Sequence, residues 1–126
     1  MPASPAFAAY PDHTIDVSPH EGRVSVRLGG AVVADTERAL ALREADYPVA
    51  LYVPREDCRM ERFEATDRST HCPFKGNARY WTLRAGEGAA GETAENAAWA
   101  YDRPFDQVAA IAGHVAFYPD RVTIES

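Results

Sequence analysis

The chain has 126 residues, of which 46% are hydrophobic and 25% are charged, and its formal net charge at pH 7 is −6. This length suits one domain with one core, and the ordinary apolar content excludes a disordered or fibrous protein. No apolar run reaches the roughly 18 residues of a membrane span, and the acidic balance argues against general nucleic-acid binding. We therefore expect a soluble cytoplasmic protein with neither nucleic acid nor membrane as a partner.

The residue types that hold metals and cofactors are sparse. Cys58 and Cys72 are the only cysteines, and the four histidines are scattered along the chain. Structural zinc sites need paired ligands at close spacing, so we predict no metal site. The glycine-rich segment 86–88 is too short for a phosphate-binding loop and no helix is expected after it. We expect no cofactor.

Apolar residues recur with a period of two more often than with a helical period. Three prolines in residues 1–12 predict a loosely ordered N-terminal arm, and residues 13–126 are expected to form a single β-rich domain. Strands are expected at residues 15–17, 23–28, 31–33, 39–43, 49–53, 78–84, 97–101, 115–117 and 122–124, and a short extended segment is expected around residues 60–65.

The segments between these strands carry turn signals. Residues 55–59 and 105–112 predict short helical turns, residues 67–77 an ordered loop, and the glycine-rich residues 86–96 a mobile connection. Short strands with turns every 8 to 12 residues predict a mainly β, antiparallel, sandwich-like or barrel-like fold with one or two short helical turns.

One loop gathers groups that could carry chemistry. His71, Cys72, Lys75 and Gly76 place an imidazole, a thiol, an amine and a permissive glycine within six positions. Residues 51–84 are locally positive, which suits a small anionic ligand.

Lys75 is the only lysine in the chain and could hold a phosphate or carboxylate as a point charge. Desolvation beside Arg79 could instead suit it to Schiff-base chemistry, and Cys72 near His71 could form an activated thiolate. The alternative is a packed structural loop in which Lys75 is solvated.

Aromatic residues supply candidate walls for a cleft. Alternation places Trp99 and Tyr101 on one face of their strand, whereas Tyr80 and Trp81 lie on opposite faces of theirs. Only one of the latter two can therefore face the main core. We expect the loop at 70–80 to lie against the strand at 97–101, with Lys75 facing a cleft.

Four blocks of sequence resemble a known bacterial family, the domain of unknown function 427, which also carries a nucleotidyltransferase-type label. The blocks are residues 52–57, residues 70–76 followed by Ala78 and Tyr80, residues 99–101 with Pro104, and residues 113–118. The resemblance implies a β-tent fold, in which two antiparallel sheets meet at an angle and leave a cleft. Relatives of that architecture often hold zinc between paired cysteines, which this sequence lacks.

The family pattern implies cleft residues at these positions of the chain: Arg55, Asp57, Cys72, Lys75, Tyr80, Trp99 and Tyr101. The nucleotidyltransferase label has little support in the residues, because Glu56 and Asp57 are adjacent and need not converge on a metal ion.

Two functional hypotheses follow. In the first, the chain is a small enzyme or binding protein whose cleft takes an anionic or carbonyl-bearing small molecule. Its catalytic candidates are Lys75, Cys72, Asp57 and His71, and its ligand-binding candidates are Tyr52, Arg55, Tyr80, Trp99 and Tyr101. In the second, the chain is a non-catalytic module that recognises a protein or peptide through its sheet edges. A homodimer is compatible with both.

Overall fold

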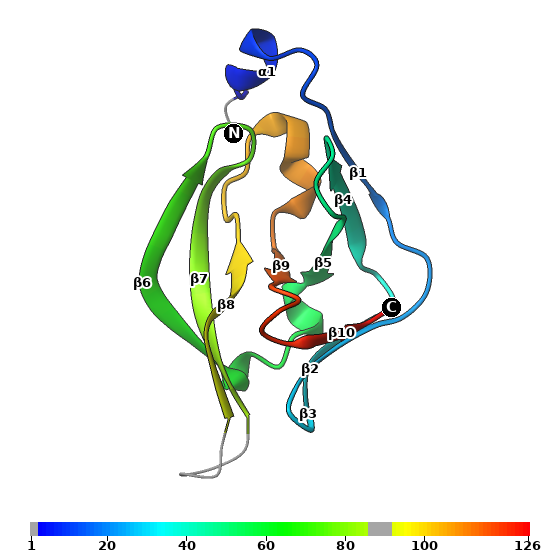
Figure 1. The fold of residues 1–126 in the computed structure, drawn as a ribbon, viewed down its shortest axis with the longest axis vertical. Helices are drawn as coiled ribbons and strands as arrows, with labels where there is room; N and C mark the ends of the chain where they lie inside the picture. Colours follow the sequence, from blue (N-terminus) through cyan, green and yellow to red (C-terminus); the bar gives the residue numbers. More distant parts are fainter. Residues whose placement is uncertain (1–2, 86–91) are drawn as a thin grey trace.

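The computed structural model describes residues 3–85 and 92–126, and it is mainly β (Figure 1). The strands in these ranges are β1 (Ile15–Pro19), β2 (Val24–Leu28), β3 (Ala31–Thr36), β4 (Leu40–Glu44), β5 (Ala50–Pro54), β6 (Phe63–Cys72), β7 (Gly76–Ala85), β8 (Glu92–Ala100), β9 (His114–Phe117) and β10 (Thr123–Glu125). The helical segments are short: α1 (Ala6–Ala9), η1 (Arg55–Asp57), η2 (Met60–Arg62) and η4 (Asp106–Ile111). The predicted mainly β fold is confirmed.

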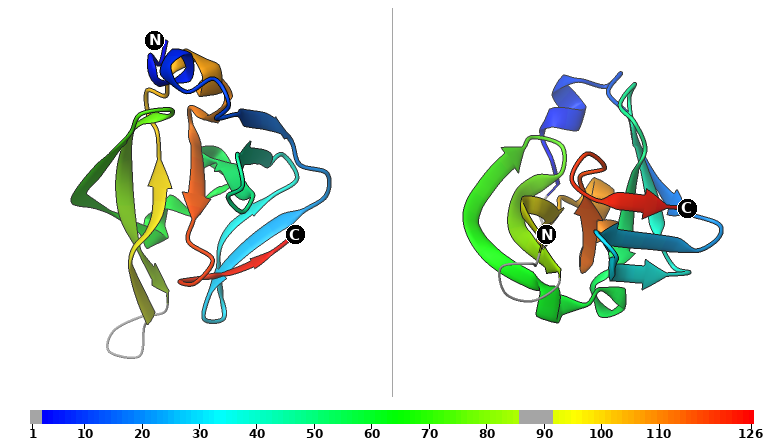
Figure 2. Two further views of the ribbon diagram at one scale, coloured as in Figure 1. Left: turned by 45° about the horizontal axis from the view of Figure 1, so that its top comes forward. Right: turned by 60° about the horizontal axis from the view of Figure 1, so that its bottom comes forward.

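The strands form two antiparallel sheets. The larger sheet has seven strands in the order β1-β4-β5-β9-β8-β7-β6, and the smaller has three in the order β10-β2-β3. In the described ranges, the edge strands β1 and β6 of the larger sheet do not pair with each other, so this sheet is not a closed barrel. Both views in Figure 2 show β9 standing between the green and yellow strands β6 to β8 on one side and the blue and cyan strands on the other.

The prediction of a loop over residues 67–77 is wrong. β6 continues to Cys72 and β7 begins at Gly76, so only residues 73–75 form the turn of this hairpin. β6 is an edge strand whose side chains are mostly exposed, and it therefore lacks the apolar alternation by which a half-buried strand is identified. Its polar residues also discourage edge-to-edge association.

The predicted connection over residues 86–96 is also too long. β8 begins at Glu92, so residues 92–96 belong to a strand, while residues 86–91 lie outside the described part of the chain.

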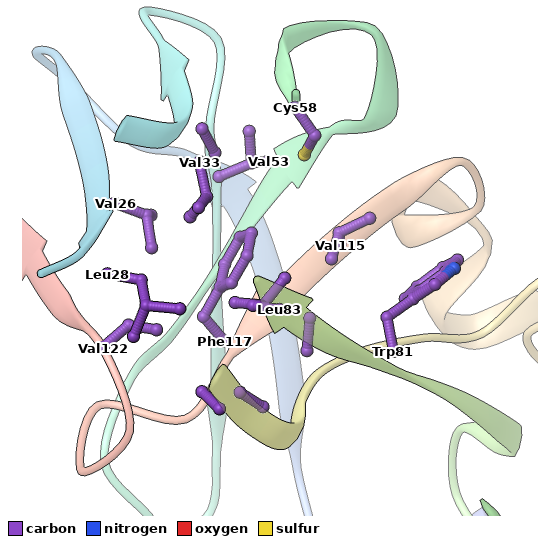
Figure 3. Close-up of a cluster of buried hydrophobic side chains, with 14 of the residues drawn as sticks. Val26, Leu28, Val33, Val53, Cys58, Trp81, Leu83, Val115, Phe117 and Val122 are labelled. Carbon is purple, nitrogen blue, oxygen red and sulfur yellow. The ribbon is translucent and has the colours of Figure 1, made fainter. Parts of the chain in front are cut away.

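Apolar side chains are buried on both faces of the larger sheet. Val53, Trp81 and Phe117 belong to a first cluster, which also contains residues of the smaller sheet. Their chain neighbours Tyr52, Tyr80 and Ala116 belong to a second cluster, because successive side chains of a strand point to opposite faces. Figure 3 shows the first cluster, in which Val26 and Leu28 of the smaller sheet face Phe117.

The first cluster makes a direct stability prediction. Leu83 is fully buried in it, so we expect Leu83→Ala to lower the free energy of unfolding by about 3 to 4 kcal/mol, through lost burial and the cavity left behind. Urea denaturation followed by circular dichroism measures this loss. Val49→Ala is the control, because Val49 is 48% exposed and should lose far less. A Leu83→Ala loss no larger than that of the control would contradict the packing described here.

Candidate functional site

The turn between β6 and β7 presents Lys75 to the concave part of the larger sheet. The turn is held by its backbone: the amide of Phe105 donates to the carbonyl oxygen of Lys75 at 3.0 Å. Lys75 Nζ donates to Glu44 Oε1 at 2.6 Å, and these side chains are only 16% and 10% exposed. Glu44 ends β4, whereas Lys75 lies beside β7, and β5, β9 and β8 stand between those two strands in the sheet. The ion pair therefore connects the two ends of a curled sheet.

Glu44 has a second partner on its other oxygen. His13 Nε2 lies 2.8 Å from Glu44 Oε2, and the His13 ring stacks on Phe74 at a centroid distance of 3.8 Å. Burial alone would raise the pKa of Glu44, but the hydrogen bonds with Lys75 and His13 outweigh it and lower that pKa below its usual value. The group at the centre of the site is thus an ionised carboxylate.

The N-terminal segment covers the turn that carries Lys75. Phe7 of α1 packs edge-on against Phe74 at 5.0 Å, and Tyr10 does so at 6.3 Å. Ser4 is 4% exposed, and its hydroxyl donates to the carbonyl oxygen of Pro73 at 2.6 Å. This segment therefore packs against the two residues that precede Lys75 in the turn.

Aromatic side chains of the second cluster line the same concave face. Lys75 Nζ lies 5.8 Å from the centroid of the Tyr101 ring, within the range of a cation–π contact. Trp99 Nε1 donates to the Tyr52 hydroxyl at 3.3 Å, and the Trp99 and Tyr118 rings are 4.4 Å apart. Burial raises the pKa of Tyr52 and of Tyr101 well above the usual value, so both phenols are neutral hydrogen-bonding groups.

A hollow of about 670 Å³ opens beside these rings and is lined by residues of both clusters; its size is usual for small-molecule sites. Its apolar lining includes Leu42, Tyr52, Trp99, Phe117, Tyr118 and Ile124. Of the described residues that line it, only Glu44 and Lys75 are charged. Tyr47 and Val49 also line it and are 67% and 48% exposed, so an apolar surface continues from the hollow to the outside of the molecule.

A second set of polar side chains surrounds the hydroxyl groups of Tyr80 and Tyr118. The Tyr80 hydroxyl is 2.9 Å from Thr70 Oγ1 and 3.5 Å from the Tyr118 hydroxyl, and the Arg68 guanidinium lies over the Tyr80 ring. Burial would raise the pKa of Tyr80, but the hydrogen bonds with Thr70, Tyr118 and Arg68 lower it. Burial and the contact with Tyr80 raise the pKa of Tyr118 to about 12.

The structure brings together six of the nine residues singled out from the sequence. Tyr52, Cys72, Lys75, Tyr80, Trp99 and Tyr101 all belong to the second cluster, pack against it or contact a member of it. Cys72 is half-buried and packs against this cluster. His71 is exposed at the side of the hairpin, where its Nδ1 lies 2.7 Å from Asn77 Oδ1.

Arg55 and Asp57 lie elsewhere. The Arg55 guanidinium stacks over Trp81 at 4.9 Å, as does that of Arg79 at 4.7 Å, and Trp81 belongs to the first cluster. Asp57 accepts hydrogen bonds from Thr36 at 2.7 Å and from Arg38 at 3.2 Å. The expected arginine neighbour of Lys75 is therefore replaced by a carboxylate.

Sequence reasoning missed Glu44, His13 and Tyr118. A signal for Glu44 was present, because Leu40, Leu42 and Glu44 alternate on one face of β4, and a carboxylate in the third position of an apolar face needs a partner. His13 carried no such signal, since it meets Glu44 across 31 residues of sequence.

Two further features of the described ranges bear on function. No three His, Cys, Asp or Glu side chains among these residues come close enough together to hold a metal ion. None of the helices in these ranges has the length and apolar content needed to cross a membrane.

A family model described as a domain of unknown function (DUF427) matches residues 16–126. The matched range includes Glu44, Lys75 and the aromatic lining of the hollow, and it begins after His13. No curated protein matches the chain.

Proposed function

The chain belongs to the DUF427 family, and we propose that it binds, in the hollow beside Lys75, a small molecule that presents an anionic or carbonyl oxygen. The observation that carries the proposal is the shielded Glu44–Lys75 ion pair in the wall of an otherwise apolar hollow. A buried ion pair is seldom more stabilising than well-packed apolar side chains. Charged groups held in an apolar concavity are therefore candidates for ligand recognition.

Hydrogen-bond donors remain at this wall. An ammonium group has three N–H donors, and Glu44 is the one carboxylate in the described ranges within 4.0 Å of Lys75 Nζ. The Tyr52 hydroxyl accepts from Trp99 and keeps its own hydrogen to donate. An acceptor oxygen of a ligand in the hollow can therefore meet the remaining donors of Lys75, while Tyr52, which is 1% exposed, forms part of the buried wall.

The geometry favours Lys75 as an anchor over Lys75 as a nucleophile. Lys75 Nζ is held in an ion pair with Glu44, to which it donates a hydrogen bond, whereas imine formation requires a free amine lone pair. Nucleotidyl transfer receives no support from the acidic pair of the sequence, because Glu56 and Asp57 both contact Arg38. Binding is thus the function that the site supports best.

The test uses the fact that Lys75 is the only lysine. Small carboxylates, ketones, esters and amides are screened by thermal shift, since a ligand at 100 times its Kd adds about 2.7 kcal/mol of stability. Compounds that stabilise the protein are then tested for protection of Lys75 against an amine-acylating reagent, read by peptide mass spectrometry. We expect about tenfold protection of Lys75.

The α-amino group of the chain is the internal control, because it should be acylated at the same rate with and without ligand. Lys75→Arg keeps the charge but changes the donor geometry, and we expect it to fold normally and bind the same compounds more weakly. Binding without protection of Lys75, or equal binding by Lys75→Arg, would contradict the proposed anchor.

A further inference from the structure

We propose that the ligand of this hollow is an uncharged carboxamide on an apolar body, with its carbonyl oxygen at Lys75 and its N–H at Glu44. This inference rests on the proposed function and narrows its ligand class. Glu44 and Lys75 both line the hollow, and they lie side by side in its wall. A donor and an acceptor in adjacent positions form the complement of an amide, which offers C=O and N–H in adjacent positions.

Glu44 and Lys75 have enough free hydrogen-bonding positions to bind an amide while they remain paired with each other. Each carboxylate oxygen accepts about two hydrogen bonds, and in the contacts of the described residues Glu44 Oε1 receives Lys75 and Oε2 pairs with His13. Each oxygen therefore keeps one site for an incoming N–H. Lys75 keeps two N–H donors for an incoming carbonyl.

The charge of the wall selects against ligands with a net charge. Glu44 and Lys75 cancel, and they are the only charges among the described lining residues. A ligand carboxylate at Lys75 would place a second anion close to Glu44, where the low local dielectric makes like-charge repulsion costly. A ligand ammonium at Glu44 would meet Lys75 with the same result. An amide makes both contacts and adds no charge.

The remainder of the hollow requires an apolar body. Aromatic rings of Tyr52, Trp99 and Tyr118 line it, and exposed Tyr47 and Val49 extend the apolar surface outward. An alkyl chain attached to the amide would replace water along this surface. Each methylene buried there should tighten binding about three- to fourfold until the chain reaches solvent.

The experiment is isothermal titration calorimetry of the whole wild-type chain with four octyl compounds of matched length: octanamide, N,N-dimethyloctanamide, octanoate and octylamine. We expect octanamide to bind at least tenfold more tightly than the other three. The dimethyl compound loses the N–H for Glu44, and the two ions add a charge. A series from butanamide to octanamide tests the apolar body.

A Glu44→Gln substitution provides a second measurement. Removing the negative charge should favour octanoate, so the ratio of octanamide to octanoate affinity should fall at least tenfold. Glu64→Gln is the matched control, because Glu64 pairs with Arg84 on the surface and should leave the ratio unchanged. If Glu44→Gln does not fold, the wild-type series alone decides the proposal.

The outcomes separate the two proposals. Octanoate binding more tightly than octanamide, with protection of Lys75, would overturn the carboxamide inference and leave the proposed binding function standing. Equal affinity of octanamide and its dimethyl derivative, or no gain with chain length, would also overturn the inference alone. If neither these compounds nor the members of the screen bind, the proposed function fails as well.

Discussion

Replacing Lys75 with methionine is expected to lower the free energy of unfolding by about 2 to 3 kcal/mol at pH 7. The substitution leaves the Glu44 carboxylate 90% shielded from solvent, with His13 as its remaining side-chain partner among the described residues. Removing one partner of a fully buried ion pair costs about 3 to 5 kcal/mol, and the residual exposure of this pair reduces the loss. Urea denaturation of the variant and the wild type at several pH values measures it.

The pH dependence has a definite sign. Because the pKa of Glu44 is lowered in the folded chain, the stability that Glu44 contributes is present above the pKa of the unfolded chain and is lost as the pH falls through the folded value. The difference between wild type and Lys75→Met should therefore shrink below about pH 4.5. A difference that stays constant from pH 7 to pH 3 would contradict the ion pair as its cause.

Two controls isolate the pair. Arg84→Met breaks the Arg84–Glu64 ion pair, whose side chains are more than half exposed, and it should leave the midpoint of unfolding nearly unchanged. The double variant Glu44→Leu/Lys75→Met removes both charges and should regain most of the stability lost by the single variant.

Gly76→Ala is expected to destabilise the fold by about 2 to 3 kcal/mol and to disturb the position of Lys75. Gly76 has a φ of +117°, a backbone conformation that residues other than glycine rarely adopt. An added Cβ would lie 3.2 Å from the carbonyl oxygen of Arg103. Both the strained backbone and the crowded neighbour oppose the methyl group. Thermal unfolding measures the loss, and acylation of Lys75 reports its exposure, which should increase.

Gly30→Ala is the matched control for this prediction. Gly30 lies in the turn between β2 and β3, where its φ is not positive and an added Cβ meets no atom within 4 Å. We expect a change below about 0.5 kcal/mol there. If Gly76→Ala were as stable as Gly30→Ala, the strain assigned to Gly76 would be wrong.

The extent to which the fold was predictable depends on which strands are half-buried. β2, with Val24, Val26 and Leu28 on one face, carries a clear alternation and was predicted close to its true bounds. β6 was missed beyond Ala65, because an exposed edge strand has no apolar face to produce alternation. The second buried face of the larger sheet was not predicted either, since Tyr80 and Trp81 each carry an apolar ring and nothing local says that both faces are covered.

The site was predictable where its residues lie close together in the sequence. Cys72 ends β6 and Lys75 lies in the turn that follows it, while Trp99 lies in β8 and Tyr101 directly after it, so the members of each pair are close together in the sequence and local reasoning associated them. The partner of Lys75 is Glu44, 31 residues away, and that contact depends on how strongly the seven-stranded sheet curls. Sheet curvature is a property of the whole assembly of strands, and no local pattern encodes it.

The central position of β9 divides the larger sheet into two halves with different folding requirements. β6, β7 and β8 follow one another in sequence, as do β4 and β5, so each half can form through contacts between nearby residues. Among the described strands, the backbone ladders of the two halves meet only through the four residues of β9, where Tyr52 pairs with Ala116 across 64 residues of chain. Closing so long a loop costs entropy before any contact compensates for it, which slows folding. We therefore expect the concave face that holds Lys75 and Glu44 to assemble late in folding, after the contacts within each half.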